Sequence, residues 1–266
     1  MSSLVPAILL LQSVMIAPHA LLVSGGDQTA TLDILSQDPA SVEVVLSSFY
    51  ALPVSDSAGH VVLETFEASS DSFPSAADWI QPYPRRFVLP PFGRQRVRLR
   101  VAAPPGTADG EYWGRVMVSV RPRDPPATTD IGGGISVGLS MEVRTVLPFF
   151  YRRGRLTTGV ELDGVSTTIA ADSLVLRPRL HRTQNAAFIG TLRAVLRDSA
   201  GRERGATAVP LAVYYSLSPR LTFPISGLPA GRYDARLEVV AEREDLPVGF
   251  VLPTHAVSGS ATIELP

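Results

Sequence analysis

The sequence predicts an all-β chain of two β-sandwich domains in tandem, and three observations support this prediction. No stretch of useful length has the apolar stripe of an amphipathic helix. Turn-forming residues recur about every 8 to 12 positions, which is the spacing of strands in sandwiches and barrels. One pattern also occurs twice: a turn, then a Gly, one further residue and a Tyr that opens an alternating strand, at Gly110–Tyr112 and at Gly231–Tyr233.

The repeated Gly-x-Tyr pattern indicates which kind of sandwich to expect. In immunoglobulin-like domains a Tyr at the corner between the fifth and sixth strands bonds back across the turn through its hydroxyl. Two such corners predict two immunoglobulin-like domains, and 266 residues are enough for each to bury its own core. We place the boundary at the polar stretch Arg152-Arg153-Gly154-Arg155, which gives domains over 14–152 and 153–266.

Composition narrows the classes of function. The net charge of -1 gives no electrostatic reason to expect nucleic acid or an anionic membrane surface as a partner. The chain has no Cys, which excludes disulfides, thiol catalysis and zinc-thiolate sites, and it has no Lys, which excludes Schiff-base chemistry. The 4 His are scattered singly without metal-ligand spacing. We therefore expect no cofactor, no metal and no small-molecule substrate.

The first residues resemble a targeting segment. Residues 4–11 are almost wholly apolar, too few to span a bilayer but the right number for the core of a secretory signal. We interpret residues 1–13 as the remnant of a signal peptide and expect a periplasmic or otherwise exported protein. The alternative is that residues 4–16 form the first buried strand.

The first domain contains a series of strands separated by turns. Asp56-Ser57-Ala58-Gly59 is expected to close a hairpin, and the Pro at position 18 implies an edge or a bulge in the first strand. The residues from 68 to 78 are rich in Ser, Asp and Ala and predict a surface loop. Strands are expected at 16–23, 29–34, 42–52, 60–67, 94–101, 111–120 and 135–151.

The strand at 94–101 has the clearest pattern. Its Arg residues alternate strictly with mostly aliphatic ones, so the guanidinium groups share one face. We interpret this face as solvated, with carboxylates across the strand, since the chain has no net positive charge. The alternative is a phosphate-binding face.

The second domain repeats these features. Asp198-Ser199-Ala200-Gly201 has the same four residues as the first hairpin turn and predicts another hairpin. The mixed-charge run at 242–245 is expected to be a solvated turn. Strands are expected at 166–170, 173–180, 187–197, 207–217, 221–225, 233–242 and 256–265.

The order of several of these features resembles one known family. Residues 15–34, the Asp56 hairpin, the run from Trp79 to Val101 with Pro84–Pro91 inside it, and Asp109–Val116 together are similar to the N-terminal domain of the PapD-like periplasmic pilus assembly chaperones. The resemblance extends from about residue 14 to residue 153. The second half matches only as another immunoglobulin-like domain.

The resemblance implies a mechanism. Those chaperones lend the last strand of the N-terminal domain to an incomplete pilus subunit and present alternate apolar side chains to its groove. The predicted partner is therefore a β-strand of a pilus-like or surface subunit, with an outer-membrane usher as a second partner. In the matching register the partner-binding row is Leu139, Met141 and Val143, flanked by Ile135, Val137 and Leu147.

This chain departs from the family at the anchor for the C-terminal carboxylate of the subunit. The family uses an Arg and a Lys there, and the matching positions are Pro18 and Pro148, whose side chains cannot bind a carboxylate. Arg152 and Arg153 are the candidate substitutes, because a guanidinium suits bidentate carboxylate recognition.

Two other functions are consistent with the residues. The first is a structural or adhesive envelope protein that has the chaperone fold but donates no strand. The second is a hydrolase, because residues 134–138 fit Gly-x-Ser-x-Gly around Ser136. That motif needs a turn from a strand into a helix, and here it opens an alternating strand. We therefore expect a non-enzymatic protein.

Overall fold

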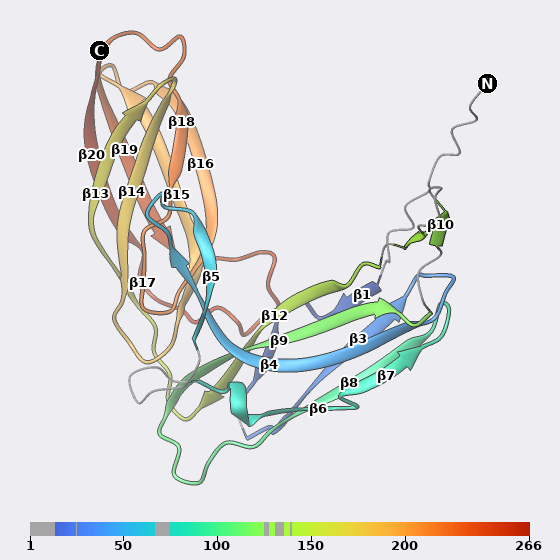
Figure 1. Ribbon diagram of the computed structural model, residues 1–266. Helices are drawn as coiled ribbons and strands as arrows, with labels where there is room; N and C mark the ends of the chain where they lie inside the picture. Colours follow the sequence, from blue (N-terminus) through green and yellow to red (C-terminus); the bar gives the residue numbers. More distant parts are fainter. Residues whose placement is uncertain (1–13, 25, 67–74, 125–127, 131–135, 139) are drawn as a thin grey trace, which may run out of the picture. The chain divides into compact units, whose positions relative to one another are not determined.

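The computed structural model describes residues 14–24, 26–66, 75–124, 128–130, 136–138 and 140–266. Regular structure in these ranges is β-strand, apart from one turn of 3-10 helix at Ala77–Trp79. Within these ranges, no helix is long and apolar enough to cross a bilayer. The predicted all-β class is thus confirmed (Figure 1). The proposed signal segment, residues 1–13, lies outside the described residues.

The chain divides into two compact units. Unit 1 takes the residues up to Phe49 together with 75–105 and 113–151. Unit 2 takes the stretch that begins at Tyr50, the stretch 106–112 and everything from Arg152 onward. Strands β4 (Val42–Ser55), β9 (Gly110–Pro122) and β12 (Val143–Arg153) each begin in one unit and end in the other. Unit 2 therefore draws on three stretches of chain, whereas the predicted second domain is a single stretch.

Unit 1 is built from two sheets. One sheet has the order β1-β3-β8-β6, and the other runs β2-β12-β9-β4, with β7 also paired to β4. The first strand expected from the sequence is split at Pro18, so that its halves β1 and β2 belong to different sheets. The strands not yet bounded are β1 (Val14–Ala17), β2 (Leu21–Val23), β3 (Thr29–Ser36), β6 (Ile80–Tyr83), β7 (Arg86–Leu89) and β8 (Arg94–Val101).

Strand β8 has the predicted alternation. Val97, Leu99 and Val101 are buried in the core, while all four Arg side chains of the strand are exposed. Asp33 on β3 accepts from Arg96 and Arg94, with Nε–Oδ1 and Nη2–Oδ2 distances of 3.0 Å each. The hydrogen bonds from Arg96 and then Arg94 lower the pKa of Asp33 to about 2. The prediction of a solvated face with a carboxylate across the strand is confirmed for this part of the stripe.

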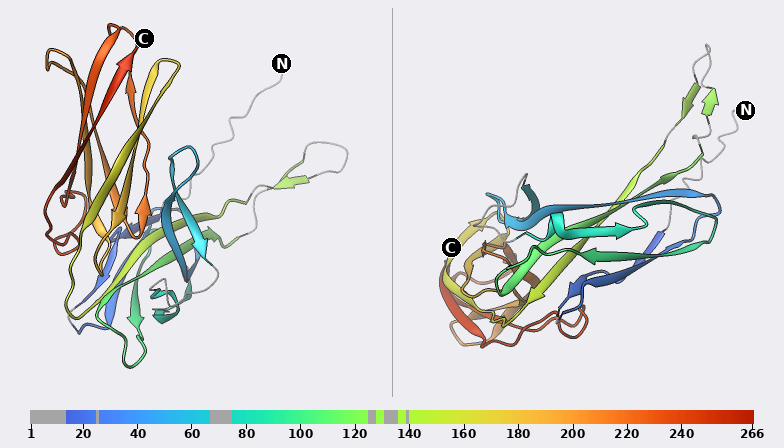
Figure 2. Two further views of the ribbon diagram at one scale, coloured as in Figure 1. Left: turned by 90° about the vertical axis from the view of Figure 1, so that its left-hand side faces the viewer. Right: turned by 90° about the horizontal axis from the view of Figure 1, so that it is seen from below.

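The expected long strand over residues 135–151 is not continuous, which corrects the sequence prediction. Residues Ser136–Gly138 form β11, which pairs antiparallel with β10 (Thr128–Asp130), and β12 begins only at Val143. Residues 140–142 between them have no regular structure. Figures 1 and 2 show the β10–β11 ribbon beyond the ends of β9 and β12. An alternating pattern does not reveal that one part of a run pairs locally with a preceding segment.

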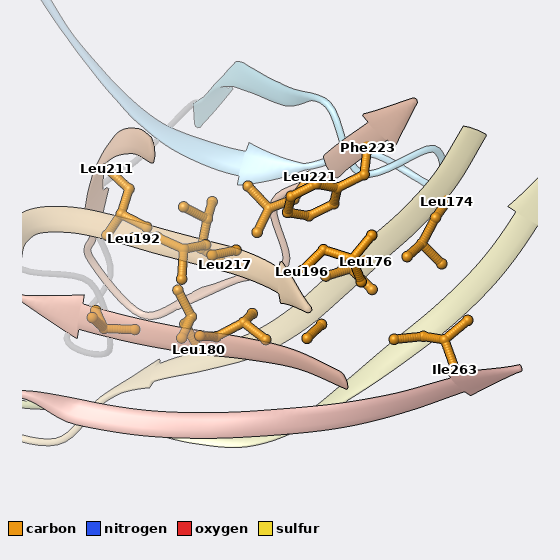
Figure 3. Packing of buried hydrophobic residues seen from close by; sticks show 14 of the residues in the cluster. Leu174, Leu176, Leu180, Leu192, Leu196, Leu211, Leu217, Leu221, Phe223 and Ile263 are labelled. Atoms are coloured by element: carbon orange, nitrogen blue, oxygen red, sulfur yellow. The ribbon is translucent and has the colours of Figure 1, made fainter. Parts of the chain in front are cut away.

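Unit 2 contains the second sandwich. One sheet has the order β13-β14-β17, with β18 also paired to β14, and the other has the order β16-β15-β19-β20. Their buried faces form one hydrophobic core that includes Leu176, Phe188 and Leu237, and Figure 3 shows part of it. These strands are β13 (Val160–Ala170), β14 (Ser173–Arg182), β15 (Phe188–Asp198), β16 (Glu203–Val213), β17 (Ser216–Leu217), β18 (Leu221–Pro224), β19 (Gly231–Val240) and β20 (Val257–Leu265).

Both predicted tyrosine corners are present. The Tyr112 hydroxyl donates to the Ala108 carbonyl oxygen at 3.0 Å. The Tyr233 hydroxyl donates to the Pro229 carbonyl oxygen at 2.8 Å. In each case the acceptor lies four residues upstream, across the turn that contains the Gly. The predicted immunoglobulin-like corner is thus confirmed at both positions.

The two Asp-Ser-Ala-Gly sequences form the same turn. Asp56 Oδ1 accepts from the backbone N–H groups of Ala58 and His60. Asp198 Oδ1 accepts in the same way from the residues two and four positions on. The Gly in each turn has a positive φ, 83° at Gly59 and 76° at Gly201, a conformation that costs other residues more. Both turns close hairpins, β4 to β5 (Val61–Phe66) and β15 to β16, as predicted.

Candidate protein-binding edge

The candidate site in unit 1 is the outer edge of β12. On one side β12 neighbours β9 along the sheet. On the other side β2 pairs with it in parallel, but only from Phe149 to Tyr151. Among the strands that the structure describes, none covers this outer edge between Val143 and Pro148. A strand edge of this kind presents backbone N–H and C=O groups that an added strand can bind.

A groove lies beside this edge. Its volume is about 650 Å³, and its lining is provided by β1, β3, the start of β8 and one residue of β12, Thr145. β1 is itself an edge strand, since it pairs only with β3 among the described strands. The groove therefore opens between the edges of the two sheets of unit 1. The lining residues are Val14, Met15, Ile16, Ala17, His19, Asp33, Leu35, Arg94 and Thr145.

The groove is apolar along most of its wall and charged at one part of it. Met15 is 55% exposed although it is a large apolar residue, and Ile16 beside it is buried. Arg94 contributes a cation that is paired with Asp33, and His19 is exposed on the same wall. A volume of this size is enough for several side chains of an extended peptide.

The residues along β12 alternate between the core and the outside. Val143 and Thr145 are half-buried and Leu147 is 3% exposed, so this row turns progressively into the core of unit 1. Val146 lies on the opposite face and is 36% exposed. The side chain of Leu147, predicted on the same face as the partner-binding row, is thus buried in the core of unit 1 and is not available to a partner. The remaining exposed part of the row lies toward the start of β12.

A charged pair lies at the start of β12. Arg144 Nε donates to Glu142 Oε1 at 2.7 Å, and both side chains are largely exposed. This hydrogen bond is the main cause of the lowered pKa of Glu142, and it raises the pKa of Arg144. Met141 and Val143, on either side of Glu142 in the sequence, carry apolar side chains.

Arg152 lies in unit 2 and is buried. Its Nε donates to Glu111 Oε2 at 2.6 Å, and the two side chains are 5% and 0% exposed. Its Nη1 and Nη2 atoms donate to the carbonyl oxygens of Gly249 and Phe250, the second at 2.6 Å. Glu111 Oε1 also accepts from the Ala187 backbone N–H at 3.0 Å. This arrangement corrects the expectation that the Arg152 guanidinium is available to a partner's carboxylate, because its donors are engaged inside its own chain.

The other predicted site residues are placed as follows. Met141 is 39% exposed and lies two residues before Val143, the first residue of β12. Arg153, the last residue of β12, is exposed. Val137 lies in β11. Ile135 and Leu139 are outside the described residues.

Sequence reasoning missed two features of these elements. It did not identify the ion pair of Glu111 with Arg152, because the two residues are far apart in sequence and each is next to a turn or a polar run. It also did not identify the groove, because its lining comes from four strands. Glu111 follows Gly110, which is buried, but only the structure shows this burial.

The alternative chemistries have these structural contexts. Ser136 of the Gly-x-Ser-x-Gly motif opens β11 in a two-stranded ribbon, whereas a nucleophile elbow requires a turn from a strand into a helix. Among the described residues, no group of three or more His, Cys, Asp or Glu side chains is arranged to hold a metal ion.

Comparison with known proteins gives structural similarity only. No protein-family model matches the sequence, and no curated protein matches it. A chain of the Salmonella enterica SafA pilin–SafB chaperone complex is 14% identical, over 94% of this chain and 96% of that one, with a TM-score of 0.44. The E. coli chaperone DraB is 14% identical, over 85% and 89%, with a TM-score of 0.42. A chain of the CsuC–CsuE chaperone–subunit complex of Acinetobacter baumannii is 12% identical, over 92% and 97%, with a TM-score of 0.46. These structures are of chaperones or of their complexes.

Proposed function

We propose that this protein binds an extended segment of another β-rich protein along the outer edge of β12, and that it acts as a chaperone for a surface or pilus-like subunit. The observation that carries the proposal is the edge of β12 between Val143 and Pro148, which no described strand covers, beside an apolar groove. Backbone hydrogen bonds to this edge would supply affinity, and the groove would select apolar side chains.

The bound segment is expected to extend the sheet β2-β12-β9 by one strand. Side chains of an added strand alternate between its two faces, so every second one would lie over the groove between β1 and β12. On this chain the contacting row would be Met141 and Val143, preceded by the predicted Leu139. Thr145 lines the groove where this row turns inward.

The role of a chaperone follows from the hazard of an unpaired edge. A subunit that lacks one strand exposes both a groove and two unpaired edges, and such surfaces aggregate unless another chain covers them. A protein with its own uncovered edge can complete that subunit for a time. This role places the protein in the periplasm or another exported location, with an outer-membrane usher as the receiving partner.

The carboxylate anchor of this chain would differ from that of the pilus chaperones. Pro18 and Pro148 occupy the matching positions, and Arg152 is engaged by Glu111. Arg153 is exposed and is the remaining candidate for a carboxylate contact. The strand pairing itself would therefore provide most of the affinity.

The proposal is tested by partner capture from periplasmic extract with a tagged chain. Replacing Leu139 and Met141 by Asp is expected to abolish co-purification of the partner, because two charges would enter an apolar contact. Val146→Asp is the matched control, since Val146 lies on the opposite face of β12 and an Asp there should leave capture unchanged. Hydrogen exchange in the captured complex should show slower exchange of the amides of residues 143–147.

Unchanged capture by the Leu139→Asp/Met141→Asp variant would reject strand binding at this edge. If the wild-type chain captured no β-rich protein and remained in the envelope, the alternative of a structural or adhesive module would replace the chaperone role.

A further inference from the structure

A second strand edge that no described strand covers is present in unit 2, on the hairpin of β4 and β5. The hairpin pairs residues 50–55 of β4 with β5, from Tyr50 opposite Phe66 to Ser55 opposite Val61. Figure 1 shows β5 in cyan beside the end of β4. Val61, Val62 and Leu63 are 47%, 44% and 46% exposed. Among the described strands, only β4 pairs with β5, so its other edge combines open backbone with exposed apolar side chains.

The register shows which backbone groups point to this outer edge. Asp56 N–H donates to the His60 carbonyl oxygen, so this residue pair is hydrogen-bonded. Hydrogen-bonded and non-hydrogen-bonded pairs alternate along an antiparallel ladder, and Val62 pairs with Val54 two positions further on. The backbone groups of Val62 and Glu64 therefore point to β4. Those of Val61, Leu63 and Thr65 point outward.

The opposite edge of the hairpin is protected. Pro53 on β4 stands opposite Leu63 at a non-hydrogen-bonded pair, so its nitrogen lies on the side of β4 away from β5 and offers no N–H to a partner. The edge of β5 from residue 61 to 66 contains one charge, at Glu64, and no Pro. Only the β5 edge of this hairpin is therefore equipped to pair.

The hairpin tip is held in place within unit 2. Arg177 Nη1 donates to the Ser57 carbonyl oxygen at 2.7 Å, and the Arg220 backbone N–H donates to the Gly59 carbonyl oxygen at 2.8 Å. The Ser218 backbone N–H donates to Ser55 Oγ at 2.8 Å. An edge that is already ordered loses less conformational entropy on pairing.

We propose that β5 pairs antiparallel with β5 of a second copy of this chain, about a two-fold axis at Val62. In this register Val61 is opposite Leu63 of the second copy, and these are the residues whose backbone groups point outward. His60 is opposite Glu64 of the second copy; its Nδ1 lies 3.2 Å from Asp56 Oδ2 of its own chain, so its Nε2 is the ring nitrogen that would face the Glu64 carboxylate. Val62 meets its own counterpart at the axis.

Other registers lose this complementarity. An axis at Leu63 places Glu64 opposite Val62, and an axis at Glu64 places two carboxylates face to face, which destabilises a cross-strand pair. A two-fold axis between two adjacent residues of β5 would place a residue whose backbone groups point outward opposite one whose backbone groups point to β4. Symmetric interfaces of this kind are self-complementary, which is the usual form of a dimer. The pairing uses no residue of β12, so its test is independent of the test of the proposed function.

The absence of Cys from the chain permits a direct test of the register. At a non-hydrogen-bonded pair the Cα atoms are about 4.5 Å apart, which is within the range for a disulfide. Val62→Cys is expected to form a covalent dimer under mild oxidation, seen on a non-reducing gel and by intact mass. Thr65→Cys is the matched control, because its two copies would be about 20 Å apart at the rise of a strand, and it should remain monomeric.

Sedimentation velocity of the otherwise unmodified chain tests the pairing without cross-linking. We expect a reversible dimer that Leu63→Pro converts to monomer, because the Pro removes an outward N–H and no bond to β4, while Leu63→Ala keeps the dimer. If Leu63→Pro lowers the unfolding midpoint, Val61→Glu provides the same test. The proposal would be overturned if the wild-type chain were a monomer and Val62→Cys formed no cross-link. This outcome would also apply if the strand of another protein, rather than a second copy, occupied this edge. Equal cross-linking of Val62→Cys and Thr65→Cys would overturn the register.

Discussion

Replacing Arg152 by Leu should strongly destabilise unit 2. The variant leaves the Glu111 carboxylate, which is 0% exposed, without its cation, and it leaves the carbonyl oxygens of Gly249 and Phe250 without their donor. Removing one partner of a buried ion pair costs about 3–5 kcal/mol. For a unit of this size, a loss of that order lowers the unfolding midpoint by roughly 10 to 20 °C.

The assay can assign the loss to unit 2. The 2 Trp residues of the chain, Trp79 and Trp113, both lie in unit 1, so their fluorescence reports on that unit while far-ultraviolet circular dichroism reports on both. We expect Arg152→Leu to lower the midpoint of the unit 2 transition, which circular dichroism detects and Trp fluorescence does not. The control Arg152→Leu/Glu111→Gln should recover about half of the loss, because it removes the unpaired charge and keeps an acceptor for the Ala187 N–H. A single variant whose free energy of unfolding lies within about 1 kcal/mol of the wild-type value, well short of the expected loss of about 3–5 kcal/mol, would refute the reasoning.

Three further predictions follow from the described contacts. The pKa of Asp33 is lowered to about 2, so the ionised carboxylate stabilises the fold above its unfolded-state pKa of about 4, and this stabilisation is lost as the pH falls toward 2. In an acid-unfolding curve followed by Trp fluorescence, Asp33→Asn should therefore reduce the dependence of stability on pH in this range. Tyr233→Phe should cost about 0.5–1.5 kcal/mol in urea unfolding, since it removes the corner hydrogen bond, and an unchanged midpoint would contradict that role. Gly190→Ala should lower the free energy of unfolding by about 1–3 kcal/mol or more, because an added Cβ would lie 2.1 Å from the Val240 carbonyl oxygen. The control Ser199→Ala, at an exposed turn, should leave the thermal midpoint within about 2 °C of the wild-type value.

The sequence was most informative where structure is decided locally. The strand at 94–101 and the two Asp-Ser-Ala-Gly turns were predicted with their bounds or nearly so, because period-two alternation and a side chain that caps its own turn depend on adjacent residues. The two tyrosine corners were predicted for the same reason. The fold class therefore followed from features that each occupy a few consecutive residues.

The candidate site was predicted less well, because it depends on which strands are neighbours. The row from Ile135 to Leu147 was treated as one strand, but pairing of β11 with β10 ends it, and Leu147 faces the core. Arg152 was predicted as a candidate for binding a partner's carboxylate, yet Glu111, 41 positions earlier, is its partner. An alternating pattern shows that one face of a strand is apolar. Only the sheet topology shows which element covers that face.

The repeated Asp-Ser-Ala-Gly turn has a consequence for the order of folding. Both copies close hairpins in unit 2, and each brings together strands that are adjacent in the sequence. Hairpins of this kind form in about 1–10 μs, and contacts of low sequence separation are made early. Unit 1 instead depends on pairs such as β3 with β8 and β2 with β12, whose residues are about 60 to 130 positions apart and close large loops. The carboxyl-terminal unit, although synthesised last, is therefore expected to reach its native pairings first, and the edge of β12 would become available only after the slower unit has closed.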